Sequence, residues 1–258
     1  MKSREGAVTP NFTTTCTELT RSNVTDPVAT LRQRMEEMQG KEGEAYPPCV
    51  VPIPYYLTGR GFFPGGDGIW RDSHQISQPA SVAFPTDGIM VLGQDFGSLK
   101  EYPAQSRSYE LDSLLTWKYL VPRLRDAHVP FDRVFFSNGL LGLRRVGSND
   151  GRHPGLSIPT YVQMCSEFLR FQIAVQNPRL IVIFDSLDES VYLPFFAAAF
   201  QHPTNVRIFR GEVLGRNRVM VKTQHPRSDC GVINRNKDNY RERCRTIEQA
   251  WQLSVALD

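Results

Sequence analysis

The chain has 258 residues, of which 40% are hydrophobic and 22% are charged, and its formal net charge is +3. This composition is sufficient for one good-sized hydrophobic core. It argues against a membrane-spanning protein, because no apolar stretch approaches the roughly 20 residues that cross a bilayer. The first residues carry no apolar segment typical of a secretory signal, so we expect a cytoplasmic, intracellular protein with no membrane partner.

The cysteines argue against a metal site. Five cysteines are scattered along the chain, and none of them forms a Cys-x-x-Cys pair. Zinc sites and iron–sulfur clusters need ligands at closer and more regular spacing. We therefore expect reduced thiols, with no metal and no cofactor.

The positive charge is concentrated toward the C-terminus. Residues 201–258 contain 11 Lys and Arg against 6 Asp and Glu, whereas residues 1–200 contain 19 against 21. Such an asymmetry is typical of a protein that binds a polyanion along one side. An ordinary solvated surface explains it equally well.

The N-terminal part contains one clear helix. Residues 1–24 are polar and rich in Ser, Thr and Asn, which predicts a flexible arm. Thr25 or Asp26 is suited to cap a helix that opens with Pro27 and runs to about Met38. Residues 45–87 are rich in Pro, Gly and aromatic residues and predict a long irregular stretch before the first strand of a sheet.

The rest of the chain alternates between predicted strands and helices. Four short apolar runs predict buried strands, at residues 89–92, 134–137, 180–184 and 219–222. Helical patterns occur at residues 109–128, 159–176, 190–200 and 238–257. This alternation favours an α/β three-layer sandwich, with a central four-stranded parallel sheet flanked by helices. We expect a single domain over residues 25–258.

Each predicted strand is followed by a polar side chain: Asp95, Asn138, Asp185 and His225. The carboxyl ends of parallel strands meet at one edge of a sheet, so one pocket is able to collect these groups. A carboxylate there orients water and stabilises positive charge on a sugar. An amide is suited to read the edge of a flipped-out base, and an imidazole is suited to donate to an anionic leaving group.

Simpler roles for these four residues remain open. Either aspartate is able to cap a turn or a helix, and Asp185 fits that role best. Asn138 precedes a glycine and is suited to a left-handed turn. A lone histidine such as His225 is commonly a structural hydrogen-bonding residue.

Three of the strand ends carry motifs that resemble those of the uracil-DNA glycosylase superfamily. The segment Gly93-Gln94-Asp95 resembles its water-activating motif. Residues 136–144 (FSNGLLGLR) resemble its base-reading strand, in which an Asn precedes a small apolar run and a basic residue. The segment His225-Pro226-Arg227-Ser228 resembles its His-Pro-Ser motif. The motifs occur in the family's order, and the resemblance covers about residues 85–250.

The resemblance implies a monofunctional DNA glycosylase that flips out a damaged or modified pyrimidine and hydrolyses its N-glycosidic bond, leaving an abasic site. By resemblance, Asp95 positions the water, Asn138 holds the base, and His225 stabilises the departing base anion. The family's fold is a four-stranded parallel sheet between helices, which agrees with the pattern of strands and helices. We expect a monomer whose partner is DNA, either a duplex with a flipped base or a single strand.

The residues after Asp95 depart from the uracil-specific enzymes. There a Pro, a Tyr and a His follow the Asp, and the Tyr keeps thymine out of the pocket; here the residues are Phe96, Gly97 and Ser98. Because Gly97 has no side chain, we expect an open pocket for a base bulkier than uracil, such as a 5-substituted or glucosylated hydroxymethyl cytosine. Some superfamily members remove hypermodified cytosines from phage DNA, which suggests a role in antiphage defence.

Further contacts to the base and to DNA are expected around these motifs. Besides Asn138, the candidates for base binding are Gln94, Phe96, Gly97 and Tyr109. The candidates for DNA binding are Arg144, Arg227, Ser228, Arg235, Lys237 and Arg241. Core packing is the alternative for both aromatic residues. The wedge that fills the hole left by the extruded base is expected among Arg227, Asp229 and Val232.

Three other functions remain open. The first is a uracil-DNA glycosylase in base excision repair. The second is a module that recognises a modified base without cutting, because Phe96 and Ser98 alter the catalytic loop. The third is a different α/β hydrolase that acts on a small nucleoside.

Overall fold

The computed structural model describes residues 26–40, 45–52, 84–100, 115–147, 151–200, 207–229 and 237–257. The N-terminal arm expected over residues 1–24 lies outside these ranges. Most of the irregular stretch that precedes the first strand of the main sheet, residues 53–83, also lies outside them.

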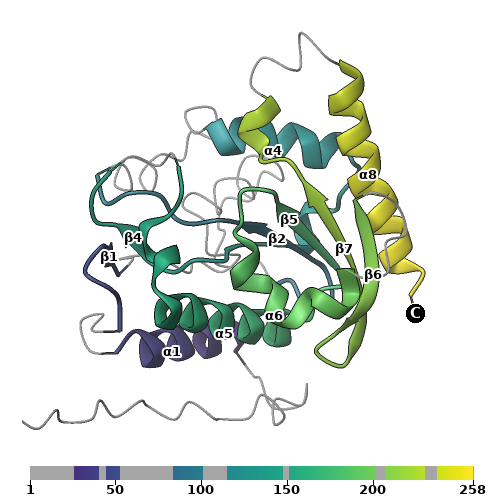
Figure 1. Cartoon of the computed structure of the whole chain (residues 1–258). Coiled ribbons are helices and arrows are strands. Elements are labelled where there is room, and N and C mark those ends of the chain that lie inside the picture. Colours follow the sequence, from purple (N-terminus) through teal and green to yellow (C-terminus); the bar gives the residue numbers. More distant parts are fainter. Residues whose placement is uncertain are drawn as a thin grey trace, which may run out of the picture.

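The described part of the chain folds around a five-stranded sheet. Its strands are β2 (Ile89–Gly93), β3 (Val134–Asn138), β5 (Leu180–Phe184), β6 (Ile208–Val213) and β7 (Arg216–Thr223). They lie in the order β3-β2-β5-β7-β6. Neighbours among β3, β2, β5 and β7 pair in parallel, whereas β6 pairs antiparallel with β7 (Figure 1).

The four expected strands are present and parallel to one another, but the expectation that they make up the whole sheet is wrong. The sheet has a fifth strand and is mixed, because β6 forms a hairpin with β7 at the edge. This strand carries no apolar run, since Ile208 and Val213 are buried but Arg210 and Glu212 are exposed. A strand that faces solvent along one side has this mixed composition.

Helices cover both faces of the sheet. α1 (Pro27–Gln39), α5 (Pro159–Gln176) and α6 (Glu189–Phe200) lie on one face, with α1 packed on α5. α4 (Leu115–Asp126) and α8 (Lys237–Val255) lie on the other face (Figure 1). The arrangement is compatible with a three-layer α/β fold, and α5 begins and ends at the residues expected from its apolar spacing.

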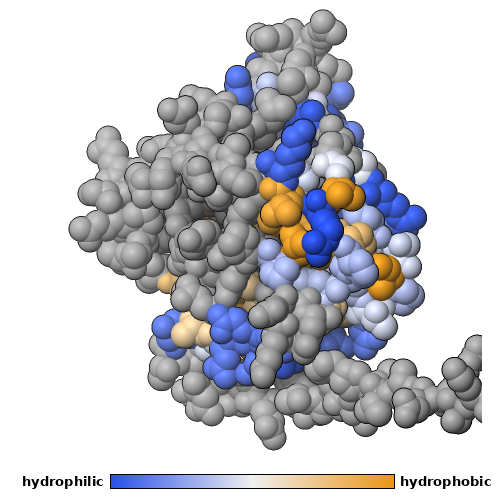
Figure 2. Space-filling model, turned by 90° about the vertical axis from the view of Figure 1, so that its left-hand side faces the viewer, coloured by the Kyte–Doolittle hydropathy of each residue, from blue (hydrophilic) through white to orange (hydrophobic). Residues whose placement is uncertain are grey.

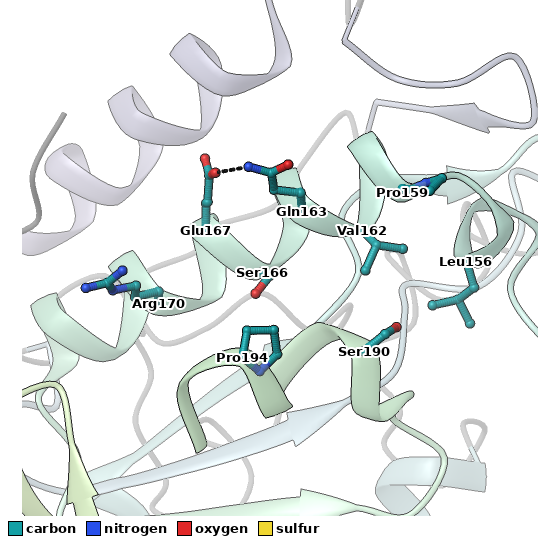
Figure 3. A pocket seen from close by; sticks show the side chains of 9 residues that line it. All are labelled: Leu156, Pro159, Val162, Gln163, Ser166, Glu167, Arg170, Ser190 and Pro194. Carbon is teal, nitrogen blue, oxygen red and sulfur yellow. Dashed lines mark hydrogen bonds between the residues drawn. The ribbon is translucent and has the colours of Figure 1, made fainter. Parts of the chain in front are cut away.

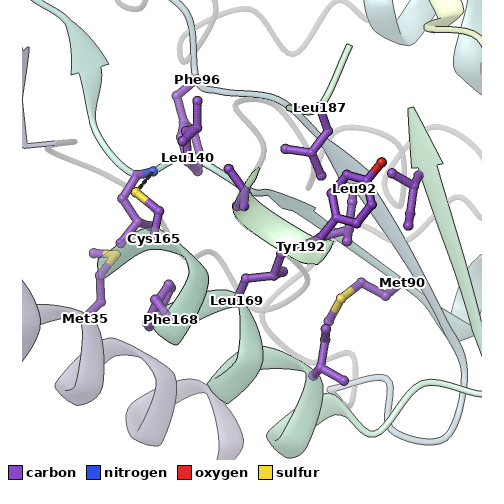
Figure 4. Packing of buried hydrophobic residues seen from close by; sticks show 14 of the residues in the cluster. Met35, Met90, Leu92, Phe96, Leu140, Cys165, Phe168, Leu169, Leu187 and Tyr192 are labelled. Carbon is purple, nitrogen blue, oxygen red and sulfur yellow. Dashed lines mark hydrogen bonds between the residues drawn. The ribbon is translucent and has the colours of Figure 1, made fainter. Parts of the chain in front are cut away.

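Two hydrophobic clusters arise from the alternation of side chains along the strands. Met90 and Leu92 of β2 face the cluster formed with α1, α5 and α6, whereas Ile89 and Val91 face the cluster formed with α4 and α8. Figure 4 shows the first cluster, into which Met35 of α1 points. These side chains are fully buried, and each stabilises the fold by about 1.5–3 kcal/mol.

The ends of α1 and α5 follow local capping rules. Asp26 Oδ1 accepts a hydrogen bond from the Ala29 N–H at 3.0 Å, so Asp26 caps α1 and Pro27 occupies the first helical position. α5 stops at Asn177, whose φ of 52° is left-handed and whose N–H donates to the Ile173 carbonyl.

A second, two-stranded sheet lies beside the first. β1 (Val50–Val51) pairs antiparallel with β4 (Leu143–Arg144), and both strands lie on the left of Figure 1. The segment that follows β3 therefore contains a short strand. Its partner lies in the Pro- and Gly-rich stretch near residue 50, far away along the sequence.

The surface carries small apolar areas among polar ones. Figure 2 looks onto the side on the left of Figure 1, where described hydrophobic groups lie among hydrophilic side chains. Leu99 and Val146 are exposed by 45% and 72%, an ordinary level for scattered surface residues. Within the described residues, no helix combines the length and the apolar character that crossing a bilayer requires.

Gly139 lies directly after β3, where another segment approaches closely. A Cβ at this position would lie 2.4 Å from Leu187 Cδ1. We expect Gly139→Ala to lower the free energy of unfolding by about 1–3 kcal/mol, because the added methyl group overpacks the core. The loss should shrink in a Leu187→Ala background, and urea denaturation of the four proteins measures this coupling. An equal loss in both backgrounds would contradict the contact.

Candidate functional site

The loops that follow β2 and β3 run side by side. Gly93 is in register with Asn138, and beyond the strands the Leu140 N–H donates to the Gln94 carbonyl at 2.9 Å. Farther along, the Arg144 N–H donates to the Gly97 carbonyl, also at 2.9 Å. These bonds extend the pairing past the strand ends, so Asp95 and Asn138 lie at the same edge of the sheet.

Asp95 is held by three donors. Its Oδ2 accepts from Gln94 Nε2 at 2.9 Å and from Arg144 Nη2 at 2.7 Å, and its Oδ1 accepts from the Gly97 N–H at 2.7 Å. The last bond closes a tight turn, in which Gly97 has a φ of 83° that favours glycine. The side chain of Asp95 is only 6% exposed. The carboxylate is therefore fixed in orientation, and Gly97 has a backbone role besides its lack of a side chain.

Arg144 does not have the role expected from the sequence. The sequence predicts a contact to DNA, but the Arg144 side chain is buried beside Asp95 and also donates to the Gly151 carbonyl at 2.9 Å. Its position in β4 turns it toward the loop after β2. In the described structure its guanidinium binds protein groups instead of facing solvent, where phosphates would approach.

Asn138 is the last residue of β3 and is 2% exposed. It is absent from the described residues with positive φ, so the alternative of a left-handed turn residue is wrong. Its amide lies at the same edge of the sheet as Asp95.

His225 follows β7, and its loop is attached to the end of β5. The His225 N–H donates to Asp185 Oδ1 at 2.9 Å, and the Asp185 N–H donates to the Thr223 carbonyl at 2.9 Å. Asp185 therefore holds the His225 loop instead of capping α6. Asp188 provides the oxygen near the start of that helix, where its Oδ1 accepts from the Ser190 N–H at 3.0 Å.

The imidazole of His225 is neutral with its proton on Nε2. Burial lowers its pKa to about 4, and the positive charge of Arg123 acts in the same direction. The negative charges of Asp185 and Asp95 oppose this shift, so Asp95 is close enough to act on the ring. Nδ1 accepts the Arg227 N–H at 3.2 Å, which leaves Nε2–H as a donor.

A buried charge cluster clamps the His225 loop. Arg123 of α4 donates to the carbonyl groups of Gln224 and His225. Its guanidinium also binds Asp229, which ends the 3-10 helix η8 (Pro226–Asp229). Asp229 binds Arg243 of α8 as well, and its side chain is fully buried. Asp229 is therefore no intercalating wedge: it joins α4, η8 and α8 behind the histidine.

His153 lies near Asp95, although none of the sequence motifs includes it. It precedes the 3-10 helix η7 (Pro154–Ser157), is 1% exposed, and stacks on Tyr161 with ring centroids 5.8 Å apart. Burial lowers its pKa to about 4, the charge of Asp95 opposes the shift, and that of Arg144 supports it. The segment His153-Pro154 resembles a cap before a proline, a signal that indicates a turn and no chemistry.

The other candidate residues differ in their exposure and in their contacts. Phe96 is 2% exposed and belongs to the core, so it does not stack on a base in this arrangement. Gln94 binds Asp95. Arg227 and Ser228 are exposed on η8, and Arg241 is exposed on α8. The residues outside the described structure are Tyr109, Arg235, Val232 and the side chain of Lys237.

The excess of basic residues near the C-terminus does not form one free surface. Arg216 pairs with Asp87 at 2.6 Å, and Lys222 pairs with Glu189 at 2.7 Å. Arg243 is buried in the charge cluster, and Arg218 is buried and donates to the Pro178 carbonyl at 3.0 Å. The exposed basic residues in the described part of this region are Arg210 on β6, Arg227 on η8, and Arg241 and Arg245 on α8, so the expected polyanion-binding surface is reduced to these side chains.

A hollow of about 490 Å³ lies between α5 and α6. Figure 3 shows its lining: Leu156, Pro159, Val162, Gln163, Ser166, Glu167, Arg170, Ser190 and Pro194. Asp95, Asn138 and His225 are not among these residues. The hollow is therefore separate from the group of polar side chains at the strand ends.

Within the described ranges, no three His, Cys, Asp or Glu side chains gather as they would around a metal ion. Comparison with known proteins finds no matching family model and no matching curated protein.

The charge cluster behind His225 predicts a large effect of a small substitution. We expect Asp229→Asn to lower the free energy of unfolding by about 3–5 kcal/mol, because two buried guanidinium groups lose their counterion. Asp238→Asn is the matched control, since its pair with Arg241 is exposed and 3.9 Å long. It should cost less than about 1 kcal/mol. Urea denaturation measures both variants, and similar losses would contradict the role of the cluster.

Buried His153 and half-buried His225 predict a loss of stability in acid. Unfolding raises the pKa of His153 and His225 from about 4 to the ordinary 6.5, so each takes up a proton between these values. Their contribution to stability is complete above about pH 6.5 and is lost as the pH falls toward 4, by up to about 1.4 kcal/mol per pH unit for each. Urea denaturation across this range should give a shallower slope for His225→Asn than for the wild type.

Proposed function

We propose that the chain is a monofunctional DNA glycosylase that flips out a modified pyrimidine and hydrolyses its N-glycosidic bond, leaving an abasic site. One observation carries the proposal: a fixed carboxylate, a buried amide and an imidazole lie at the ends of three parallel strands at one edge of the sheet. The order of the motifs along the chain, which resembles that of the uracil-DNA glycosylase superfamily, supports it.

Each side chain suits one part of this reaction. Extruding the base costs a few kcal/mol, and Asn138 offers a donor and an acceptor to its edge. As the bond breaks, positive charge grows on the sugar, and the carboxylate of Asp95 stabilises it. Negative charge grows on the leaving base, and the Nε2–H of His225 donates to it without first taking up a proton.

The substrate base is larger than uracil, for example a 5-substituted or glucosylated hydroxymethyl cytosine of phage DNA. The support is Gly97, which stands where uracil-specific enzymes carry a bulky Tyr. A substrate of this kind fits a role in antiphage defence better than one in uracil repair. The protein acts as a cytoplasmic monomer without metal or cofactor, and Arg227, Ser228 and Arg241 are the described candidates to contact the DNA backbone.

A second function has one observation in its favour. Arg144 binds the Asp95 carboxylate at 2.7 Å, and a carboxylate neutralised in this way stabilises a cationic sugar less strongly. A module that recognises a modified base without cutting would tolerate this pairing. Release of free base separates the two functions, because the module binds the same DNA without releasing it.

The test is base release from matched duplexes that carry uracil, thymine, 5-hydroxymethylcytosine or its glucosylated form. We expect release of a 5-substituted base without strand cleavage, and Asp95→Asn should slow it by about 10²–10⁴-fold with nearly unchanged DNA affinity. Glu37→Gln, on the surface of α1, serves as the control with wild-type rates.

Each contrary result has a distinct meaning. Strict preference for uracil would overturn the substrate proposal and support the repair enzyme. Salt-sensitive binding without base release would support the non-catalytic module. Release of base from free nucleosides but not from DNA would support a small-nucleoside hydrolase.

A further inference from the structure

Arg144 connects Asp95 to the segment that carries His153. Its Nη2 donates to Asp95 Oδ2 at 2.7 Å and to the Gly151 carbonyl at 2.9 Å, and Gly151 lies two residues before His153. The charges of Asp95 and Arg144 both act on the His153 ring. The carboxylate and the imidazole therefore belong to one buried cluster joined through Arg144, although 58 positions separate them in the printed sequence.

The imidazole of His153 has a defined orientation of donor and acceptor. Nδ1 accepts the Gly155 N–H at 3.1 Å, so the proton of the neutral ring lies on Nε2. Nε2 is buried and has no hydrogen-bond partner among the described residues. Leaving a buried donor unsatisfied costs about 1–3 kcal/mol, and buried polar groups that lack a protein partner commonly bind an ordered water.

Asp95 has one acceptor position left. A carboxylate offers about four lone-pair sites, and the described donors occupy three of them, two on Oδ2 and one on Oδ1. The remaining site is on Oδ1, the oxygen bound by the Gly97 N–H. A water there would donate one proton to Asp95 and keep its oxygen available to a second donor.

We propose that His153 is a positioning residue whose Nε2–H, together with Asp95 Oδ1, holds the water that attacks the sugar. The inference rests on the proposed function and extends it, because none of the three motifs contains His153. The low pKa of the ring keeps it neutral at ordinary pH, so it holds the water without adding a positive charge beside the cationic sugar.

The step balances without a further reactant. The bond between the sugar C1′ and the base nitrogen breaks, and its electron pair leaves with the base. A lone pair of the water oxygen forms the new bond to C1′, and one water proton passes to Asp95. The second lone pair of the oxygen accepts from His153 Nε2–H throughout, which fixes the direction of attack.

Two substitutions separate positioning of the water from capping of η7. Asn at residue 153 keeps an acceptor where Nδ1 is, because Asn is a good cap, but removes the donor at Nε2. Gln loses the cap and brings an amide N–H to the place of Nε2. We expect His153→Asn to lower kcat by about 100-fold with unchanged KM, and His153→Gln to retain more activity despite a lower Tm.

The opposite ranking of the two variants would show a capping role only and would overturn the inference. Equal losses in both, or an unchanged kcat in His153→Asn, would overturn it too. In each of these cases the wild type releases base, so the proposed function stands.

A crystal structure of the wild type tests the water independently of activity. We expect a water within about 3.2 Å of both His153 Nε2 and Asp95 Oδ1, and its loss in His153→Asn. If the wild type releases no base from any duplex but holds this water, the proposed function fails and the water site stands. A direct bond between the two side chains, or a protein group in place of the water, would overturn the inference.

Discussion

The position of the His225 ring depends on one buried carboxylate. Asp229 lies between Arg123 and Arg243, and Arg123 also binds the carbonyl groups at the start of the His225 loop. Charges removed from water are stable only while they stay paired and hydrogen-bonded. Arg144 holds Asp95 in the same way, after the end of β2. Buried guanidinium groups thus hold both polar groups in place, which is the preorganisation that the catalysis proposed above requires.

The layered fold follows from patterns that lie within short windows of sequence. Uninterrupted apolar runs identified β2, β3, β5 and β7, since a strand covered on both faces has no polar side. The edge strand β6 could not be identified in this way, because only two of its six residues are buried. The pairing of β1 with β4 could not be predicted for another reason: each strand has only two residues, and the two strands are far apart along the chain. No local signal reports such a contact.

The site was predictable to the extent that strand ends are predictable. Asp95, Asn138 and His225 follow strands, so their common edge was implied by topology alone. The role of Arg144 could not be predicted, because the sequence around a basic residue does not show whether it binds a phosphate or a buried carboxylate. His153 was hidden for the same reason, since its neighbour Asp95 is close only after folding. The excess of positive charge near the C-terminus predicted a larger free basic surface than the structure has. Acidic partners of these residues, such as Asp87 and Glu189, lie elsewhere in the sequence.

The hairpin between β6 and β7 has a consequence at the opposite end of the sheet. Its loop consists of Leu214 and Gly215, whose φ values of 53° and 73° are those of a tight turn matched to strand twist. Such a turn locks the alignment of the two strands, and a slip of one residue would invert every side chain of β7. Two residues at the base of the sheet therefore help to determine which way the chain faces when it emerges at His225.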